Sequence, residues 1–238
     1  MRYLKHNSII MDLRELIKLL TKYEFFPTLI EPQNINGLLK SGNEIFYQYD
    51  TNDIVFNVTA SGMKSNPTEV KKIVVILNTK YKLKETLSVK SDIFEDYNFN
   101  IFIKGYWDKS ASVDDDSNFF CWHLDREPST DGNFIHPYYH FHAGGHNIGD
   151  RDPGELLLIN SPRLAHPPMD IFLAIHFVIL NFFNTKDFRD QKEILNNEAY
   201  QLIIERAQKR VLDPYFSALN GDSHDDYSKY NLFPLIYS

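Results

Sequence analysis

This chain has little cysteine, no long apolar run and no internal repeat, and each absence narrows what it can be. Its single cysteine, Cys121, excludes an intrachain disulfide and any zinc site built from several cysteines, which fits a reducing compartment. Residues 1–7 contain no apolar core of the kind that a secretory signal needs. The most apolar stretch, residues 171–183, is interrupted by His176 and Asn181 and is shorter than the roughly 20 residues that span a bilayer. We therefore expect a cytoplasmic protein with no membrane partner.

Charge and composition restrict the class of protein further. A formal net charge of −7 argues against nucleic-acid binding over the whole surface, although it leaves room for a local basic groove. With 43% hydrophobic and 24% charged residues, the chain has an ordinary globular composition, and its 238 residues are enough to bury a full core. No low-complexity linker divides it. We expect a single domain, residues 1–238, with a helical C-terminal part from about residue 169.

Hydrophobic periodicity predicts an α+β fold. The spacing of Leu13, Leu16 and Leu20 indicates a helix at residues 9–23. Apolar or alternating stretches predict strands at residues 44–49, 53–58, 72–77, 98–104, 118–125, 138–142 and 155–159, the first two joined by a tight turn at residues 50–52. Because the strands come first and do not alternate with helices, we expect an antiparallel meander packed against the N-terminal helix and C-terminal helices.

The rest of the chain predicts those helices and some loops. Residues 169–183 are apolar on nearly every side, which is typical of a buried helix. Residues 187–212 are amphipathic and predict one or two helices, stopped by Asp213 and Pro214. The acidic residues 110–117 and the polar residues 220–229 are expected to form solvated, loose segments.

Histidine is concentrated in one part of the chain. Six of the nine histidines lie between Cys121 and Pro168. His140 and His142 are two residues apart on a predicted strand, and such side chains lie on the same face of a sheet. Two aligned imidazoles form half of a metal site or an acid–base pair. We therefore place the candidate site on this strand.

Strand alternation extends the pair to four residues. On residues 118–125, His123 and Asp125 share one face and Leu124 lies on the other. If this strand pairs antiparallel with residues 138–142 and the apolar faces point inward, His123 and Asp125 fall beside His140 and His142. The sequence thus predicts four titratable groups that line one open face of the sheet.

Two loops supply further candidates. Arg163 and His166 precede the predicted buried helix, whose N-terminus carries a partial positive charge, so we assign them to binding an anionic substrate. His146 follows the glycine pair at residues 144–145, where backbone can approach a ligand closely. We treat His146 as a candidate metal ligand beside His140 and His142.

Two chemistries fit this cluster. A histidine pair can act as acid and base in phosphodiester cleavage without a metal. Alternatively, His140, His142 and a third group bind zinc, iron or manganese and leave a position open for water. A cupin site is disfavoured because the next glutamate after the pair is Glu155, and the glycine pair lacks the spacing of a phosphate-binding loop.

Several of these residues also have a purely structural interpretation. Asp125 can form a surface ion pair with Arg126. His176, inside an apolar helix, is interpreted as a hydrogen-bonded core residue. Cys121 stands between aromatic residues and is interpreted as a packed thiol rather than a nucleophile.

Two families resemble parts of this chain. The stretch His123-Leu-Asp125, followed by residues 138–142, resembles the TumE-like toxins of bacterial toxin–antitoxin pairs, with Asp125, His140 and His142 at the family's motif positions. His123 departs from it, because the family more often has arginine there. The resemblance implies an RNA-directed toxin or nuclease-like activity.

The order of elements is also similar to the ubiquitin-conjugating fold. An N-terminal helix, an antiparallel meander, the His136-Pro137 loop and a following helix carry this similarity. That family has a catalytic cysteine after the loop, whereas here no cysteine follows Cys121. Conjugation chemistry is therefore not expected even if the fold matches.

Together these features favour a histidine-cluster hydrolase that cleaves phosphodiesters, such as a nuclease of a bacterial toxin or defence system. The expected catalytic residues are His140, His142, Asp125 and His123, with a divalent metal, zinc or manganese, as the candidate cofactor. RNA or another phosphodiester is the expected substrate, and an antitoxin or another system component the expected protein partner. The alternative is a non-catalytic interaction or scaffold protein whose histidine cluster is structural or holds a metal for stability.

Overall fold

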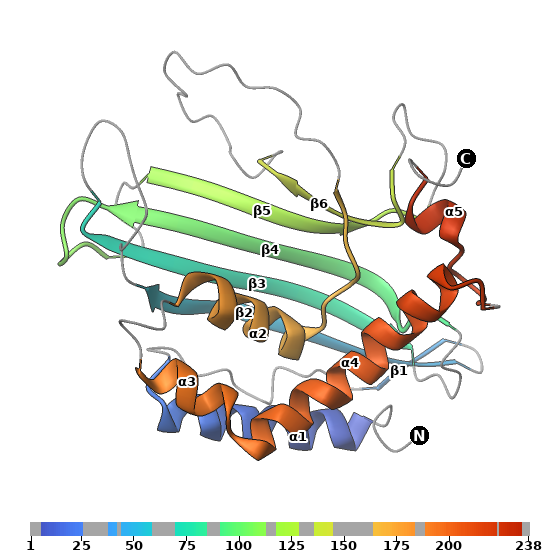
Figure 1. Ribbon diagram of the computed structural model, residues 1–238, viewed down its shortest axis with the longest axis horizontal. Coiled ribbons are helices and arrows are strands. Elements are labelled where there is room, and N and C mark those ends of the chain that lie inside the picture. Colours follow the sequence, from blue (N-terminus) through green and yellow to red (C-terminus); the bar gives the residue numbers. More distant parts are fainter. Residues whose placement is uncertain are drawn as a thin grey trace, which may run out of the picture.

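A computed structural model describes residues 6–25, 38–41, 44–58, 70–84, 91–112, 118–128, 136–144, 164–183, 189–222 and 224–234. Its described part contains one seven-stranded sheet in the order of the chain, with every neighbouring pair antiparallel (Figure 1). The α+β meander predicted from the sequence is confirmed. The strands are β1 (Leu38–Ser41), β2 (Glu44–Val58), β3 (Lys72–Lys84), β4 (Phe94–Tyr106), β5 (Asn118–Arg126), β6 (Tyr139–Ala143) and β7 (Leu164–Ala165).

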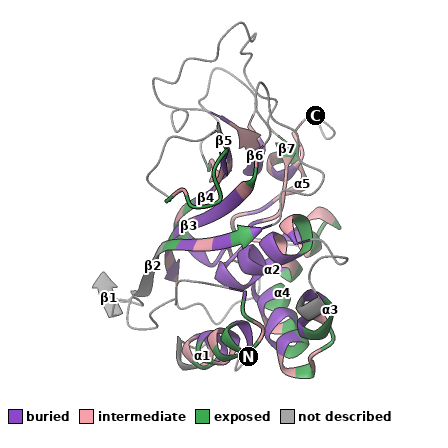
Figure 2. Cartoon of the chain, turned by 90° about the vertical axis from the view of Figure 1, so that its left-hand side faces the viewer, coloured by how far each residue is buried: buried purple, intermediate pink, exposed green. Residues whose placement is uncertain are grey.

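The helices lie against one side of this sheet, which we call the inner face (Figure 2). They are α1 (His6–Lys22), α2 (Ile171–Phe182), α3 (Arg189–Leu195), α4 (Glu198–Leu219) and α5 (Lys229–Leu232). Helix α2 packs on β3, and α4 packs on both α2 and α1. Alternate residues of β3, such as Ile73, Val75 and Leu77, point into the main hydrophobic core. No helix in the described part is long and apolar enough to cross a membrane.

A buried polar clamp fixes the start of α2. Asp170 is the N-cap, and its Oδ1 accepts hydrogen bonds from the backbone N–H groups of Phe172 and Leu173, both at 3.1 Å. Its Oδ2 accepts a hydrogen bond at 3.0 Å from Arg210 of α4, and both side chains are buried. The clamp therefore joins α2 to α4 and compensates the buried guanidinium.

Strand β2 differs from the prediction of two strands and a tight turn. It runs without a break from Glu44 to Val58, and β3 pairs with both halves. Between the pairs Thr51–Thr79 and Ile54–Leu77, β2 has one residue more than β3, which is a β-bulge. The side chain of Asn78 donates a hydrogen bond to Asp53 beside the bulge. Pairing with β3 thus keeps the polar residues 50–52 within one strand, although their sequence resembles a turn.

The C-terminal part differs in two respects. Pro214 does not stop a helix but lies inside α4, where it is buried with Val211 and Tyr215. Packing of this face outweighs the hydrogen bond that the proline removes. Nor are residues 224–229 loose: Tyr227 is buried, and the carboxylate of Asp226 accepts a hydrogen bond from the backbone of Asp92. The predicted strand at 155–159 and residues 113–117 of the acidic segment lie outside the described residues.

Candidate metal centre

The register of β5 and β6 brings the four predicted residues onto one face. His123 pairs with His142, and Asp125 pairs with His140. Directly opposed residues of an antiparallel pair point to the same side of the sheet. Their neighbours Leu124 and Phe141 belong to the main core. The four groups therefore lie on the outer face, opposite the helices, as alternation predicts.

Three of the four side chains converge. Oδ2 of Asp125 and Nε2 of His142 are 2.5 Å apart. Asp125, His140 and His142 each offer one potential ligand atom, and these three atoms all lie within 4.8 Å of one another. Two imidazoles and one carboxylate at this separation form a set that a single divalent cation can draw together.

His140 is oriented by the backbone. Its Nδ1 lies 2.9 Å from the carbonyl oxygen of Pro137, and a carbonyl can only accept, so Nδ1 carries the hydrogen. The lone pair of the neutral ring is then on Nε2. A histidine that ligates a metal commonly has its other ring nitrogen bonded to a carbonyl in this way. The Pro137 contact thus prepares His140 as a ligand.

His123 is engaged differently. Its Nδ1 lies 2.6 Å from Oδ1 of Asn100 on β4, and its Nε2 is hydrogen-bonded to the carbonyl oxygen of Gly144. Asn100 in turn donates to Asn98 at 2.5 Å. Both ring nitrogens of His123 thus have partners outside the Asp125, His140 and His142 set. This arrangement favours a supporting role for His123 beside His142, whose ring centroid is 5.0 Å away.

A further histidine, His136, extends the row of neighbouring imidazole rings. Its ring centroid is 5.3 Å from that of His140, which is 5.8 Å from that of His142. Sequence reasoning placed His136 only in a loop, and the His136-Pro137 pair was its single signal. The structure places it at the end of the row away from His123.

The electrostatics favour the ligating forms of these groups. Burial raises the pKa of Asp125, but the hydrogen bond from His142 and the nearby histidines outweigh burial and hold this pKa below its usual value. Burial lowers the pKa of His140, which the hydrogen bond to Pro137 only partly offsets. Burial likewise lowers the pKa of His123. The first two of these shifts favour the carboxylate form of Asp125 and the neutral form of His140, which are the forms that bind a metal.

The predicted face is less open than expected. His123 is 6% exposed and His140 only 3%, whereas the side chain of Asp125 is 49% exposed and that of His142 is 21% exposed. The outer face is therefore partly covered, and Asp125 is the most accessible of the four. Alternation assigns a residue to a face but does not determine what packs over that face.

Other predicted residues lie elsewhere. His166 is not brought to the cluster: its ring contacts Phe141, a core residue of the inner face, at 4.6 Å, and its Nδ1 lies 2.6 Å from the carbonyl oxygen of Pro167. Arg163 and His146 lie outside the described residues. Arg126 forms an ion pair with Asp92 at 2.9 Å, while Asp125 contacts His142 instead. His176 contacts the Tyr200 hydroxyl at 3.0 Å, and Cys121 is buried, as their structural interpretations predict.

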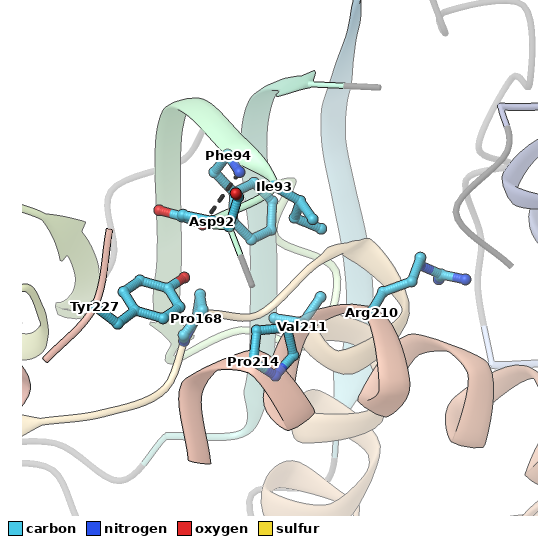
Figure 3. Close-up of a pocket in the computed structure, with 9 residues that line it drawn as sticks. Asp92, Ile93, Phe94, Pro168, Arg210, Val211, Pro214 and Tyr227 are labelled. Carbon is cyan, nitrogen blue, oxygen red and sulfur yellow. Dashed lines mark hydrogen bonds between the residues drawn. The ribbon is translucent and has the colours of Figure 1, made fainter. Parts of the chain in front are cut away.

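A second polar cluster surrounds Asp92, beside a small pocket between the start of β4 and α4 (Figure 3). The Asp92 carboxylate accepts hydrogen bonds from Arg126, the Tyr139 hydroxyl and the Phe94 backbone. These bonds satisfy the buried charge within the protein. The Asp92 cluster is therefore structural and joins β4, β5 and β6.

Comparisons with family models, with curated proteins and with solved structures find no match to this chain.

Proposed function

We propose that the chain is a divalent-metal-dependent hydrolase of phosphodiesters, with Asp125, His140 and His142 as the metal ligands. The observation that carries this proposal is the convergence of one ligand atom from each of the three residues within 4.8 Å. The hydrogen bond from His140 to Pro137 is the second-shell contact expected of such a ligand.

The ligand set suits zinc or manganese in a hydrolytic role. Catalytic zinc sites use three protein ligands and keep a fourth position for water. The side chain of Asp125 is half exposed, so water and substrate can reach the metal position from its side. The TumE-like resemblance rests on the same three residues and implies the same class of reaction.

A divalent ion held by Asp125, His140 and His142 would lower the pKa of a water at its open position and so supply the nucleophile. As the oxygen of that water bonds to phosphorus, the bond from phosphorus to the leaving oxygen would break, and the leaving oxygen would take up a proton from solvent. The ring of His136 lies 5.3 Å from that of His140, between centroids, and His136 is outside the ligand set. We therefore assign to His136 the role of the base that accepts the proton of the attacking water.

The test uses a small chromogenic diester, bis(4-nitrophenyl) phosphate, with zinc or manganese. We expect hydrolysis by the wild-type chain and a loss of more than about 100-fold in His140→Ala and in His142→Ala. His176→Gln, on the opposite side of the sheet, is the matched control and should retain activity. If both site variants keep the wild-type rate, the hydrolase proposal fails and the histidine cluster is structural, as in the non-catalytic interaction protein.

A further inference from the structure

A cysteine and a histidine lie side by side on the outer face of β5. Cys121 and His123 are two residues apart along the strand, and 3.6 Å separates Sγ of Cys121 from Nε2 of His123. Both residues are buried, Cys121 with 1% and His123 with 6% of its surface exposed. Neither belongs to the proposed set of metal ligands. We call these two residues the thiol–imidazole pair.

A glycine that follows β6 brings a backbone oxygen to this pair. Gly144 has a φ of 82°, in the left-handed region that favours glycine, and its N–H donates a hydrogen bond to the Cys121 carbonyl at 3.0 Å. The carbonyl oxygen of Gly144 lies 3.2 Å from Sγ of Cys121 and is hydrogen-bonded to Nε2 of His123. Sulfur, nitrogen and oxygen donors from β5 and the end of β6 thus converge at one buried position.

The separation of the sulfur and nitrogen atoms suits a single bridging metal ion. In protein sites a thiolate sulfur lies about 2.3 Å, and an imidazole nitrogen about 2.1 Å, from an ion such as zinc. An ion at these distances from two atoms that are 3.6 Å apart makes an S–metal–N angle of about 110°, close to the tetrahedral value. The thiol–imidazole pair can therefore bind one ion without a change of backbone conformation.

The contacts of His123 with two oxygens also favour an ion at Nε2. Oδ1 of Asn100 lies 2.6 Å from Nδ1, and the hydrogen bond from Asn100 to Asn98 keeps that oxygen turned toward the ring. A neutral ring carries one hydrogen, so without an ion it can donate to only one of the two oxygens, that of Asn100 or that of Gly144. With an ion at Nε2, the hydrogen is on Nδ1 and Asn100 accepts it, which is the outer contact that a ligating histidine commonly makes.

Charge and ligand softness select a monovalent ion. A thiolate and a neutral imidazole together carry one negative charge, so a monovalent cation leaves the buried set neutral, whereas a divalent cation leaves a buried net charge. On β4, the register partner of Cys121 is Phe102, which packs with the Val74 cluster, so the thiol has apolar surroundings on that side. Asp125, by contrast, is half exposed, so water can hydrate the excess charge of a divalent ion there. Thiolate ligands select copper(I), and imidazole also binds copper.

We propose that Cys121 and His123 bind one copper(I) ion, with the Gly144 carbonyl oxygen as a weaker third contact. This inference goes beyond the proposed function and does not depend on it. As the ion binds, the Cys121 thiol releases its proton to the buffer, and the one ring hydrogen of His123 is held on Nδ1 by Asn100. Copper stays in the +1 state throughout, so binding needs no oxidant or reductant.

The test is anaerobic competition for copper(I) between the chain and the chromogenic chelator bicinchoninate, with one equivalent of zinc present. We expect wild type to bind one equivalent of copper(I), and X-ray absorption at the copper edge to show one sulfur ligand. Cys121→Ser, whose hydroxyl can still donate to the Gly144 carbonyl, should bind copper(I) at least about 100-fold more weakly. Met11→Leu, which removes an exposed sulfur from α1, is the matched control and should bind like wild type.

The outcomes keep this proposal separate from the metal-centre proposal. Asp125→Asn should retain the copper(I) affinity of wild type, and Cys121→Ser should retain its zinc affinity. Wild type that binds no copper(I), folded Cys121→Ser that binds it as tightly as wild type, or a copper shell of nitrogen and oxygen alone would each overturn the copper proposal. If Cys121→Ser does not fold, the copper edge of wild type and of Met11→Leu decides whether sulfur is a ligand.

Discussion

Asp125 and His142 meet diagonally across β5 and β6, with 2.5 Å between Oδ2 and Nε2. Neither is the other's register partner, since Asp125 pairs with His140 and His142 with His123. A proton shared in this contact must leave before both atoms bind one cation. The same pair can therefore exist as a metal-free acid–base pair or as two ligands of a metal centre.

Chelation distinguishes these two states. Dialysis against EDTA should abolish hydrolysis of bis(4-nitrophenyl) phosphate, and one equivalent of zinc or manganese should restore it, because the metal lowers the pKa of the attacking water. Calcium, which prefers oxygen ligands, is the control and should not restore the activity. Undiminished hydrolysis in EDTA would instead assign catalysis to the Asp125–His142 pair alone.

Metal affinity should depend on pH in a defined direction. Protons compete with metal for His140, and burial holds the pKa of His140 below the ordinary value of 6.5. The zinc Kd, measured by titration calorimetry, should therefore change little above the ordinary histidine pKa of about 6.5 and rise as the pH falls below it. A Kd that improves on acidification would contradict the assignment of neutral His140 as a ligand.

His123 should matter more for stability than for metal binding. Replacing it by leucine removes its hydrogen bonds to the Gly144 carbonyl and to Oδ1 of Asn100, which costs about 1–3 kcal/mol of unfolding free energy. The zinc Kd of His123→Leu should change far less than that of Asp125→Asn. Urea unfolding and calorimetry on the same samples provide both numbers, with Lys18→Gln, an exposed residue of α1, as the control. Loss of metal binding at unchanged stability would make His123 a ligand.

The pH dependence of stability provides a second readout for His123. Because burial lowers its folded pKa, the unfolded chain takes up the proton first as the pH falls. Its contribution is therefore complete above about pH 6.5 and is lost as the pH falls below that value. His123→Leu should show a shallower decline in this range than wild type.

Asp170 should be among the most destabilising positions to replace. Asp170→Ala removes the N-cap of α2 and leaves Arg210, 2% exposed, without its closest carboxylate. Breaking such a buried pair costs about 3–5 kcal/mol. Glu15→Gln, in an exposed pair on α1, should leave the melting temperature unchanged. Similar melting temperatures for Asp170→Ala and wild type would show that the clamp contributes little.

The shared face of His123, Asp125, His140 and His142 could be predicted because side chains alternate strictly along a strand, whatever the rest of the fold does. The diagonal contact of Asp125 with His142 could not, because it depends on the register. The partners Asn100 and Pro137 were also missed, since they come from a neighbouring strand and from a backbone carbonyl that carries no sequence signal.

The wrong predictions outside the site also arise because tertiary packing overrides local sequence preferences. Pro214 is a helix breaker by local rules, yet burial against the core keeps α4 continuous. The polar residues before Ile54 resemble a turn, yet pairing with β3 makes them a bulge in one long strand. The burial of His140 depends on residues far away in the sequence, and local hydrophobic periodicity cannot predict such contacts.

Metal titration of the purified chain tests the central claim most directly. Zinc and manganese are titrated by calorimetry into wild type, Asp125→Asn, His140→Ala and the control His176→Gln, with stability checked for each. Wild type and His176→Gln should bind one equivalent, and the two site variants should bind at least about 100-fold more weakly. Folded wild-type protein that binds neither metal, or site variants that bind as tightly as wild type, would contradict the assignment of Asp125, His140 and His142 as a metal centre.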